Sequence, residues 1–210
     1  MKIFNVSIYG LEESIVRSGY PMRTEIPLDF VEDVSKLKAV MYSSNLQGDS
    51  TLLYENQHFK RAMKLGSATQ GSGHDAWAKG VIVQFDITMP QYWWQQAQRY
   101  HWFDIVSSQS KMHKILEMDL NTAFVEGQFN SSALENLKLY IQMYKEGKCD
   151  FEDLLDEVPM GLEYTAAIST NYLQLKTMYK QRRNHRLSQW QYFCDWCEGL
   201  PYFKEIVGNN

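Results

Sequence analysis

With 44% apolar and 22% charged residues, this 210-residue chain is long enough for one well-buried domain and short for two, and its composition excludes a disordered, collagen-like or low-complexity protein. The net charge of -4 argues against general nucleic-acid binding, although a local basic cluster could still hold a small phosphate. No apolar stretch approaches the ~20 residues of a membrane-spanning helix, and the first residues lack a signal-peptide hydrophobic segment, so we expect a cytoplasmic protein.

The N-terminal part of the chain predicts one strand followed by two helices. Residues 2–9 alternate between apolar and polar side chains, as in a half-buried strand, and Gly10 closes the pattern. From residue 29 to residue 41, apolar residues recur at helical spacing. Residues 59–65 repeat that spacing, and Gly66 provides a stop.

A glycine-rich loop and a second strand follow. The loop covers residues 66–74, and residues 81–89 then alternate like a strand that ends at Pro90. Because proline is favoured in the first turn of a helix, we expect a helix over residues 91–103.

The second half of the chain is expected to be largely helical. A capping box at Ser132-Ala133-Leu134-Glu135 predicts the start of one helix. Further helices are predicted over residues 151–158, 162–183 and 187–198. No internal repeat, linker or composition break is present in the sequence. We therefore predict one α+β domain over residues 1–210, with a small antiparallel sheet and a largely helical second half.

Motifs of several common chemistries are missing from the sequence. The glycine-rich loop lacks the Gly-Lys-Ser/Thr ending of a P-loop, and it precedes a strand where a dinucleotide fingerprint would follow one. Ser107, Ser108 and Ser110 lie near His101 and His113, but no Gly-x-Ser-x-Gly elbow accompanies them. The histidines have no His-Glu-x-x-His spacing, so no metal site is predicted from them.

Three cysteines, Cys149, Cys194 and Cys197, form no even disulfide framework. Cys194 and Cys197 have the spacing of half a zinc site or of a redox dithiol. No second Cys/His pair accompanies them, and the segment is predicted to be helical. Reduced thiols without a metal are therefore the expected state.

Residues 180–186 form a dense basic cluster in an acidic protein. Arginine binds phosphate oxygens with two parallel hydrogen bonds, so a monophosphate ligand would explain the cluster. A solvated helix end is the alternative, because cations also stabilise the C-terminus of a helix.

Two segments carry a pattern known from one enzyme family. In the first, a Gly-His pair at His74 leads into the strand that ends at Pro90 and then into a helix carrying Gln96 and Arg99. The second contains Arg99-Tyr100-His101 followed by Ser110-Lys111-Met112.

A third segment, from Pro159 to Trp190, contains Asn171, Arg182 and His185 at matching positions. Together the three segments resemble the flavin-dependent thymidylate synthases, which are α+β homotetramers with active sites between subunits. The resemblance covers roughly the last two thirds of the chain and implies a thymidylate synthase-complementing-protein-like fold.

The resemblance also implies an activity and a set of site residues. The activity is reductive methylation of dUMP, or of a related pyrimidine deoxynucleotide, at C5, with FAD as cofactor and with NADPH and methylenetetrahydrofolate as co-substrates. By resemblance, the nucleotide would contact Gln96, Arg99, Ser110 and Arg182, of which Arg182 is also the catalytic candidate. The flavin would contact His74, Tyr100, His101, Asn171 and His185.

The chain departs from the family pattern at three cationic or polar positions. In the family's Arg-His-Arg motif, Tyr100 replaces the histidine and His101 replaces the second arginine. In its Ser-x-Arg motif, Met112 replaces the arginine. Each lost charge-assisted hydrogen bond weakens anion binding by about 1.5 to 3 kcal/mol unless another cation compensates. Two alternatives therefore stay open: a flavoenzyme that modifies a different pyrimidine, and a non-catalytic descendant of the fold that binds a nucleotide or a protein partner.

Overall fold

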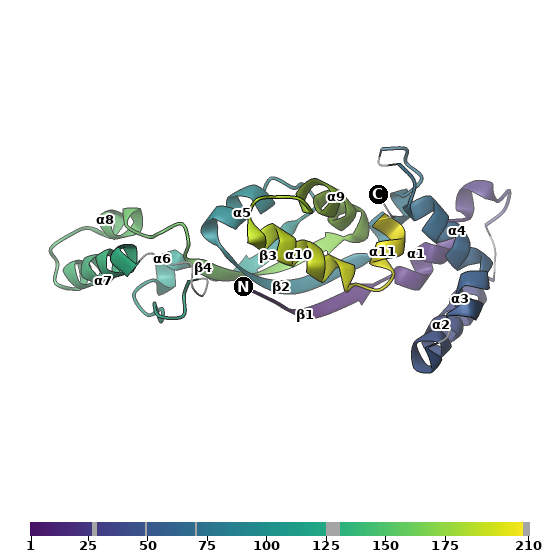
Figure 1. Cartoon of the computed structure of the whole chain (residues 1–210), viewed down its shortest axis with the longest axis horizontal. Coiled ribbons are helices and arrows are strands. Elements are labelled where there is room, and N and C mark those ends of the chain that lie inside the picture. The colour runs from purple at the N-terminus through teal and green to yellow at the C-terminus, as the bar shows by residue number, and fades with distance from the viewer. Residues whose placement is uncertain (27–28, 49, 70, 125–130, 208–210) are drawn as a thin grey trace. The chain divides into compact units, whose positions relative to one another are not determined.

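The computed structural model describes residues 1–26, 29–48, 50–69, 71–124 and 131–207, and Figure 1 labels their helices and strands. The strands are β1 (Lys2–Tyr9), β2 (Ile82–Pro90), β3 (Asp104–Ser108) and β4 (Glu163–Asn171). The helices are α1 (Leu11–Arg17), α2 (Phe30–Gln47), α3 (Thr51–Glu55), α4 (Gln57–Gly66), α5 (Gln91–Ala97), α6 (Lys111–Lys114), α7 (Ser131–Lys145), α8 (Phe151–Asp156), α9 (Tyr172–Arg182), α10 (Ser188–Glu198) and α11 (Phe203–Val207). Two short 3-10 helices are η1 (Tyr20–Met22) and η2 (Ala76–Gly80).

The strands form a four-stranded antiparallel sheet in the order β1-β2-β4-β3. Between β2 and β4, the hydroxyls of Thr88 and Thr165 are hydrogen-bonded at 2.7 Å. Between β3 and β4, Asp104 lies opposite Ser169, and the register shifts between Ile105 and Ser107. The α+β fold class and the antiparallel sheet predicted from the sequence are confirmed.

The chain divides into two compact units. Unit 1 comprises residues 1–6 and 85–169, and unit 2 comprises residues 7–84 and 170–210. The boundaries between the units fall within β1, β2 and β4. That residues 1–210 form one domain stays a prediction.

In unit 1, α5 buries two tryptophans beside the strands. Trp93 and Trp94 are 0% and 1% exposed, and Trp94 stacks on Tyr164 of β4 with ring centroids 5.1 Å apart. A second cluster of apolar residues lies under α7 and α8, which pack together (Figure 1). Its buried members are Ile115, Leu120, Ala123, Leu134, Leu137, Leu154 and Leu162.

In unit 2, α4 packs against α1 and α11. The side chain of Asn56 accepts hydrogen bonds from the backbone nitrogens of His58 and Phe59, which caps the start of α4. Phe59, Ala62 and Met63 are buried on one face of this helix, as the helical spacing predicts.

The helix predicted from residue 162 was wrong over its first part, because residues 163–171 form β4 and Leu162 pairs with Phe124 in an isolated bridge. Thr165, Ile168 and Thr170 are β-branched residues, which favour a pleated strand. The predicted continuous helix therefore begins only at Tyr172, and Asn171 marks the switch from strand to helix.

Three other boundaries differ from the prediction. The helix predicted over residues 91–103 ends at Ala97, and β3 follows where no strand was expected. The helix predicted to be capped by Ser132 begins at Ser131, so Ser132 lies inside it. The helix predicted over residues 151–158 ends at Asp156.

Candidate functional site

The site residues predicted from the sequence divide between the two units. Those in unit 1 are Gln96 on α5, Arg99, Tyr100 and His101 in the turns after it, and Ser110 before α6. The Ser110 hydroxyl caps α6 by accepting a hydrogen bond from the backbone nitrogen of His113 at 3.4 Å. The side chains of Arg99 and His101 are exposed, so solvent and ligands reach both.

The remaining predicted residues are His74, Asn171, Arg182 and His185, all in unit 2. Asn171 caps the N-terminus of α9, where its Oδ1 accepts a hydrogen bond from the backbone nitrogen of Gln174 at 2.9 Å. Arg182 and His185 lie at the other end of this helix, about 15 Å away at 1.5 Å of rise per residue. A single ligand would have to be extended, as a dinucleotide is, to contact both ends of α9.

At the C-terminal end of α9, Arg182 and His185 gather around Trp190 of α10. The Arg182 guanidinium carbon lies 4.7 Å from the centroid of the indole, which is a cation–π contact. The Nδ1 atom of His185 accepts a hydrogen bond from the backbone nitrogen of Leu187 at 3.1 Å. Burial and the nearby Arg182 and Arg186 lower the pKa of His185, so this histidine is neutral at pH 7.

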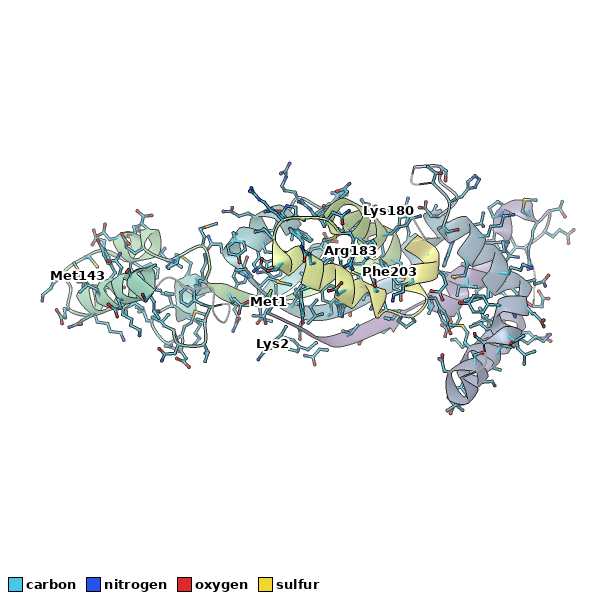
Figure 2. All side chains as sticks on the ribbon, in the orientation of Figure 1. Met1, Lys2, Met143, Lys180, Arg183 and Phe203 are labelled. Atoms are coloured by element: carbon cyan, nitrogen blue, oxygen red, sulfur yellow. The ribbon has the colours of Figure 1, made fainter. Side chains whose placement is uncertain are left out.

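The basic cluster over residues 180–186 is not uniform, because the charge of Arg183 is compensated by two carboxylates of α10. Figure 2 labels Arg183 and Lys180 of this cluster. Its guanidinium forms ion pairs with Asp195 and, at 3.4 Å, with Glu198. Arg183 therefore joins two helices, and phosphate binding by the rest of the cluster, including Arg182 and the exposed Arg186, stays a prediction.

His74 lies on the wall of a cavity of about 820 Å³ within unit 2. This volume is in the range of small-molecule and cofactor sites, about 300–1,000 Å³. The wall also contains three basic side chains, Arg17, Arg61 and Lys64, which the sequence analysis did not single out. The other lining residues are Ser14, Ser18, Tyr20, Pro21, Met22, Leu65, Gly73, Ala76, Trp77 and Gly80.

Three hydrogen-bond acceptors hold the Arg61 side chain in place, and they lie on α1, just after α1 and on α4. It donates to the Val16 carbonyl at 3.3 Å, to the Ser18 hydroxyl at 3.4 Å and to Nδ1 of His58 at 3.0 Å. Gly19 packs directly beside this guanidinium, since a Cβ at Gly19 would lie 2.5 Å from its central carbon. The charge is therefore fixed at the cavity before any ligand arrives.

Trp77 gives the cavity an aromatic wall. Its Nε1 is enclosed by the protein and has no hydrogen-bond partner within the part of the chain that the structure describes, so the indole offers the cavity aromatic surface and not a donor. An anionic aromatic molecule, such as a flavin or a nucleotide, fits the combination of cations and aromatic surface.

His58 lies between the cavity residue Arg61 and Asp33. Since Nδ1 of His58 accepts from Arg61, its proton is on Nε2, which faces Asp33 at 3.5 Å. Burial lowers the pKa of His58, opposed by the nearby Asp33 and Asp29 and assisted by Arg61 and Arg23. Neutral His58 is therefore the form that stabilises the fold.

We predict that the free energy of unfolding decreases as the pH falls below 6.5, the ordinary pKa of histidine. The folded state binds fewer protons at His58 than the unfolded state, so stability is complete above this pH and is lost as the pH falls through the lowered pKa. Urea denaturation at about pH 7.5 and about pH 5.5 measures this loss. His58→Gln should reduce the difference in unfolding free energy between the two pH values. The same change at the exposed His113 should leave this difference unaltered.

The cysteine pair lies on α10, and both thiols are buried. Burial raises the pKa of Cys194 to about 12, and the pKa of Cys197 lies well above its usual range. Both side chains are therefore neutral thiols at pH 7, with little thiolate for redox exchange. Among the described residues, no group of three or more His, Cys, Asp or Glu side chains is placed to hold a metal ion.

The chain has the α+β fold of the flavin-dependent thymidylate synthases. It is similar to the flavin-dependent thymidylate synthase ThyX from Helicobacter pylori complexed with FAD and dUMP, with a TM-score of 0.64 and 15% identity over 99% of this chain and 97% of that one. A second structure of Helicobacter pylori thymidylate synthase X with FAD and dUMP has a TM-score of 0.60 and 15% identity over 81% of this chain and 91% of that one.

No family model and no curated protein sequence matches the chain. The likeness is therefore one of fold, and it includes the N-terminal third, where the sequence resemblance was poor. Within the described residues, no helix is both long and apolar enough to cross a membrane.

Proposed function

We propose that this chain is a flavin-dependent enzyme that methylates dUMP, or a related pyrimidine deoxynucleotide, reductively at C5. The observation that carries the proposal is the cavity of unit 2, which places Arg17, Arg61 and Lys64 beside His74 and Trp77. The proteins of the same fold were solved with FAD and dUMP, and both of these ligands are anionic and aromatic. Methylenetetrahydrofolate and NADPH are the proposed co-substrates.

In this proposal the protein supplies charge and orientation. Arg61 and Lys64 attract the phosphates, Trp77 provides an aromatic surface, and Arg182 anchors the nucleotide phosphate. When bound, the flavin would supply the hydride of the reductive step. Gln96, Arg99 and Ser110 are the proposed contacts to the pyrimidine nucleotide, and Tyr100, His101, Asn171 and His185 complete the proposed flavin contacts.

The proposal includes assembly into a cytoplasmic homotetramer. Light scattering of the purified protein determines the mass of the assembly, and a mass of one chain would contradict the tetramer without affecting the ligand-binding part of the proposal.

The absorbance spectrum of the purified protein, before and after addition of FAD and then during titration with dUMP, tests the proposal. Bound flavin whose spectrum shifts with dUMP would place both ligands at one site. Protein that takes up no FAD would overturn the flavin mechanism. An assay with dUMP and dCMP, read by the mass of the product, then identifies the pyrimidine.

We predict that Arg182→Ala weakens dUMP binding about 10-fold to 100-fold, because one charge-assisted contact to the phosphate is lost. Isothermal titration calorimetry measures this change. Arg183→Ala is a matched control, since that guanidinium is already paired with Asp195 and Glu198, and it should bind dUMP like the parent. Unchanged affinity of the Arg182→Ala variant would show that the anchor is assigned wrongly.

The replaced cationic positions favour one other function. Met112 is 56% exposed where the family pattern has an arginine, and Tyr100 and His101 replace the central histidine and the second arginine of Arg-His-Arg. A descendant of the fold that binds nucleotide without turning it over explains these changes. Tight binding of FAD and dUMP without methylated product, with both co-substrates present, would favour this second function.

A further inference from the structure

Lys176 is a fully buried lysine, 0% exposed, in the middle of α9. Its ammonium lies 2.6 Å from Oδ2 of Asp75 and donates to the carbonyl oxygens of Gly66 at 2.5 Å and Ala68 at 3.3 Å. These three acceptors match the three N–H donors of an ammonium group. Burial of a lysine charge is tolerated only with such pairing, so the arrangement of its partners is tightly constrained.

The partners of Lys176 lie at the two ends of the glycine-rich loop between α4 and η2. Gly66 and Ala68 begin the loop, and Asp75 ends it just before η2. Within the loop, Gly71 and Gly73 have positive φ angles of 85° and 78°. A Cβ atom added at either glycine would meet none of the described atoms within 4 Å. Since these glycines have no close packing partners, contacts at the base of the loop determine its position.

Lys176 and its three partners do not line the cavity, but several chain neighbours of these partners do. Leu65 precedes Gly66, while His74 and Ala76 flank Asp75, and all three neighbours are on the cavity wall. One ammonium group therefore connects α9 to two of the segments that form this wall, the end of α4 and the residues around Asp75.

We propose that Lys176 is a positioning residue for the cavity: by pairing with Asp75 and binding the loop base, it holds His74 and the end of α4 in the arrangement that accepts an anionic aromatic ligand. The identity of that ligand rests on the proposed function. The positioning role itself does not, because it concerns the order of the loop in the ligand-free protein.

The test uses the full chain with Lys176→Met, which keeps the length of the side chain and removes its charge. Circular dichroism first establishes that the variant is folded. FAD titration, followed by absorbance, should then give an affinity about tenfold weaker than that of the parent. Hydrogen exchange measured by mass spectrometry at short labelling times, which report local opening and not global unfolding, should be faster in peptides covering residues 66–75 than in the parent, with α10 unchanged at those times. A purely structural role would raise exchange throughout unit 2.

Lys38→Met is the matched control, because it removes a lysine from a surface ion pair with Glu13 in the same unit, away from the loop. Its FAD affinity and loop exchange should equal those of the parent. A Lys176→Met protein with parental affinity and parental loop exchange would overturn the positioning role.

Two further outcomes are decisive. If Lys176→Met does not fold, the double variant Asp75→Asn/Lys176→Met, which leaves no unpaired buried charge, gives the same two readouts. If the parent itself takes up no FAD, the flavin proposal fails, and loop exchange alone decides the positioning role: faster exchange over residues 66–75 supports it, and unchanged exchange overturns it.

Discussion

Replacing Trp94 with alanine is expected to lower the free energy of unfolding by about 3–5 kcal/mol, the usual cost of removing a large buried aromatic side chain. Trp94 is 1% exposed, stacks on Tyr164 and contacts the ring of Trp93 edge-to-face at 5.1 Å. Its Nε1 also donates to the Met89 carbonyl at 3.0 Å. One side chain thus joins α5 to the ends of β2 and β4.

Urea denaturation measures this loss, and two further variants separate its causes. Trp94→Phe keeps an aromatic ring and should recover part of the stability, with about 1 kcal/mol still missing for the hydrogen bond to Met89. Trp102→Ala is the control, since that side chain is 56% exposed and its removal should cost less than about 0.5 kcal/mol. Equal losses for Trp94→Ala and Trp102→Ala would contradict the assignment of Trp94 to the core.

The packing of Trp94 also matters for the proposed site, because α5 carries Gln96 and is followed by Arg99. If Trp94 fixes this helix on the sheet, Trp94→Phe should keep nucleotide affinity close to that of the parent. The phenylalanine ring would then hold α5, and with it Gln96 and Arg99, in place.

The elements that the sequence predicts correctly are those with a local pattern. β2 is an example, because its alternation of buried and partly exposed residues is visible without any partner strand. Likewise, α4 has a capping residue at Asn56 and a terminal glycine at Gly66. Such signals depend only on residues a few positions apart.

The two missed strands depend on partners that are distant in the sequence. β3 has five residues, most of them exposed at the edge of the sheet, so no apolar alternation marks it. β4 runs into α9 with Asn171 as the junction, and the combined run therefore has the length of one helix. Pairing of β4 with β2 and β3 decides its conformation.

The candidate site was predictable only where a motif marked it. His74 belongs to a recognisable Gly-His pair, whereas Arg17 and Arg61 lie on separate helices and meet at the cavity only in the folded chain. Nor does the sequence distinguish Arg182 from its neighbour Arg183, because the position of α10 decides that Arg183 pairs with Asp195 and that Arg182 lies over the ring of Trp190.

Lys176 has no sequence motif, and its contacts with Asp75, Gly66 and Ala68 form only in the folded chain. We predict that Lys176→Met lowers the free energy of unfolding by about 3–5 kcal/mol, because it leaves the carboxylate of Asp75, 5% exposed, without a counter-charge. Lys38→Met removes one partner of a solvent-exposed ion pair and should cost less than about 1 kcal/mol. Urea denaturation of both variants at the same pH gives the comparison.

The double variant Asp75→Asn/Lys176→Met separates the penalty of an unpaired charge from the net contribution of the pair. Replacing both members of a buried pair is often nearly neutral, whereas removing one member is not. We therefore expect the double variant to recover most of the stability that Lys176→Met loses. If it remains as unstable as Lys176→Met, the loss comes from the two loop carbonyls, Gly66 and Ala68, which then lack their donor, and not from the charge on Asp75. Either result assigns the stability of the loop base to specific contacts of one buried ammonium group.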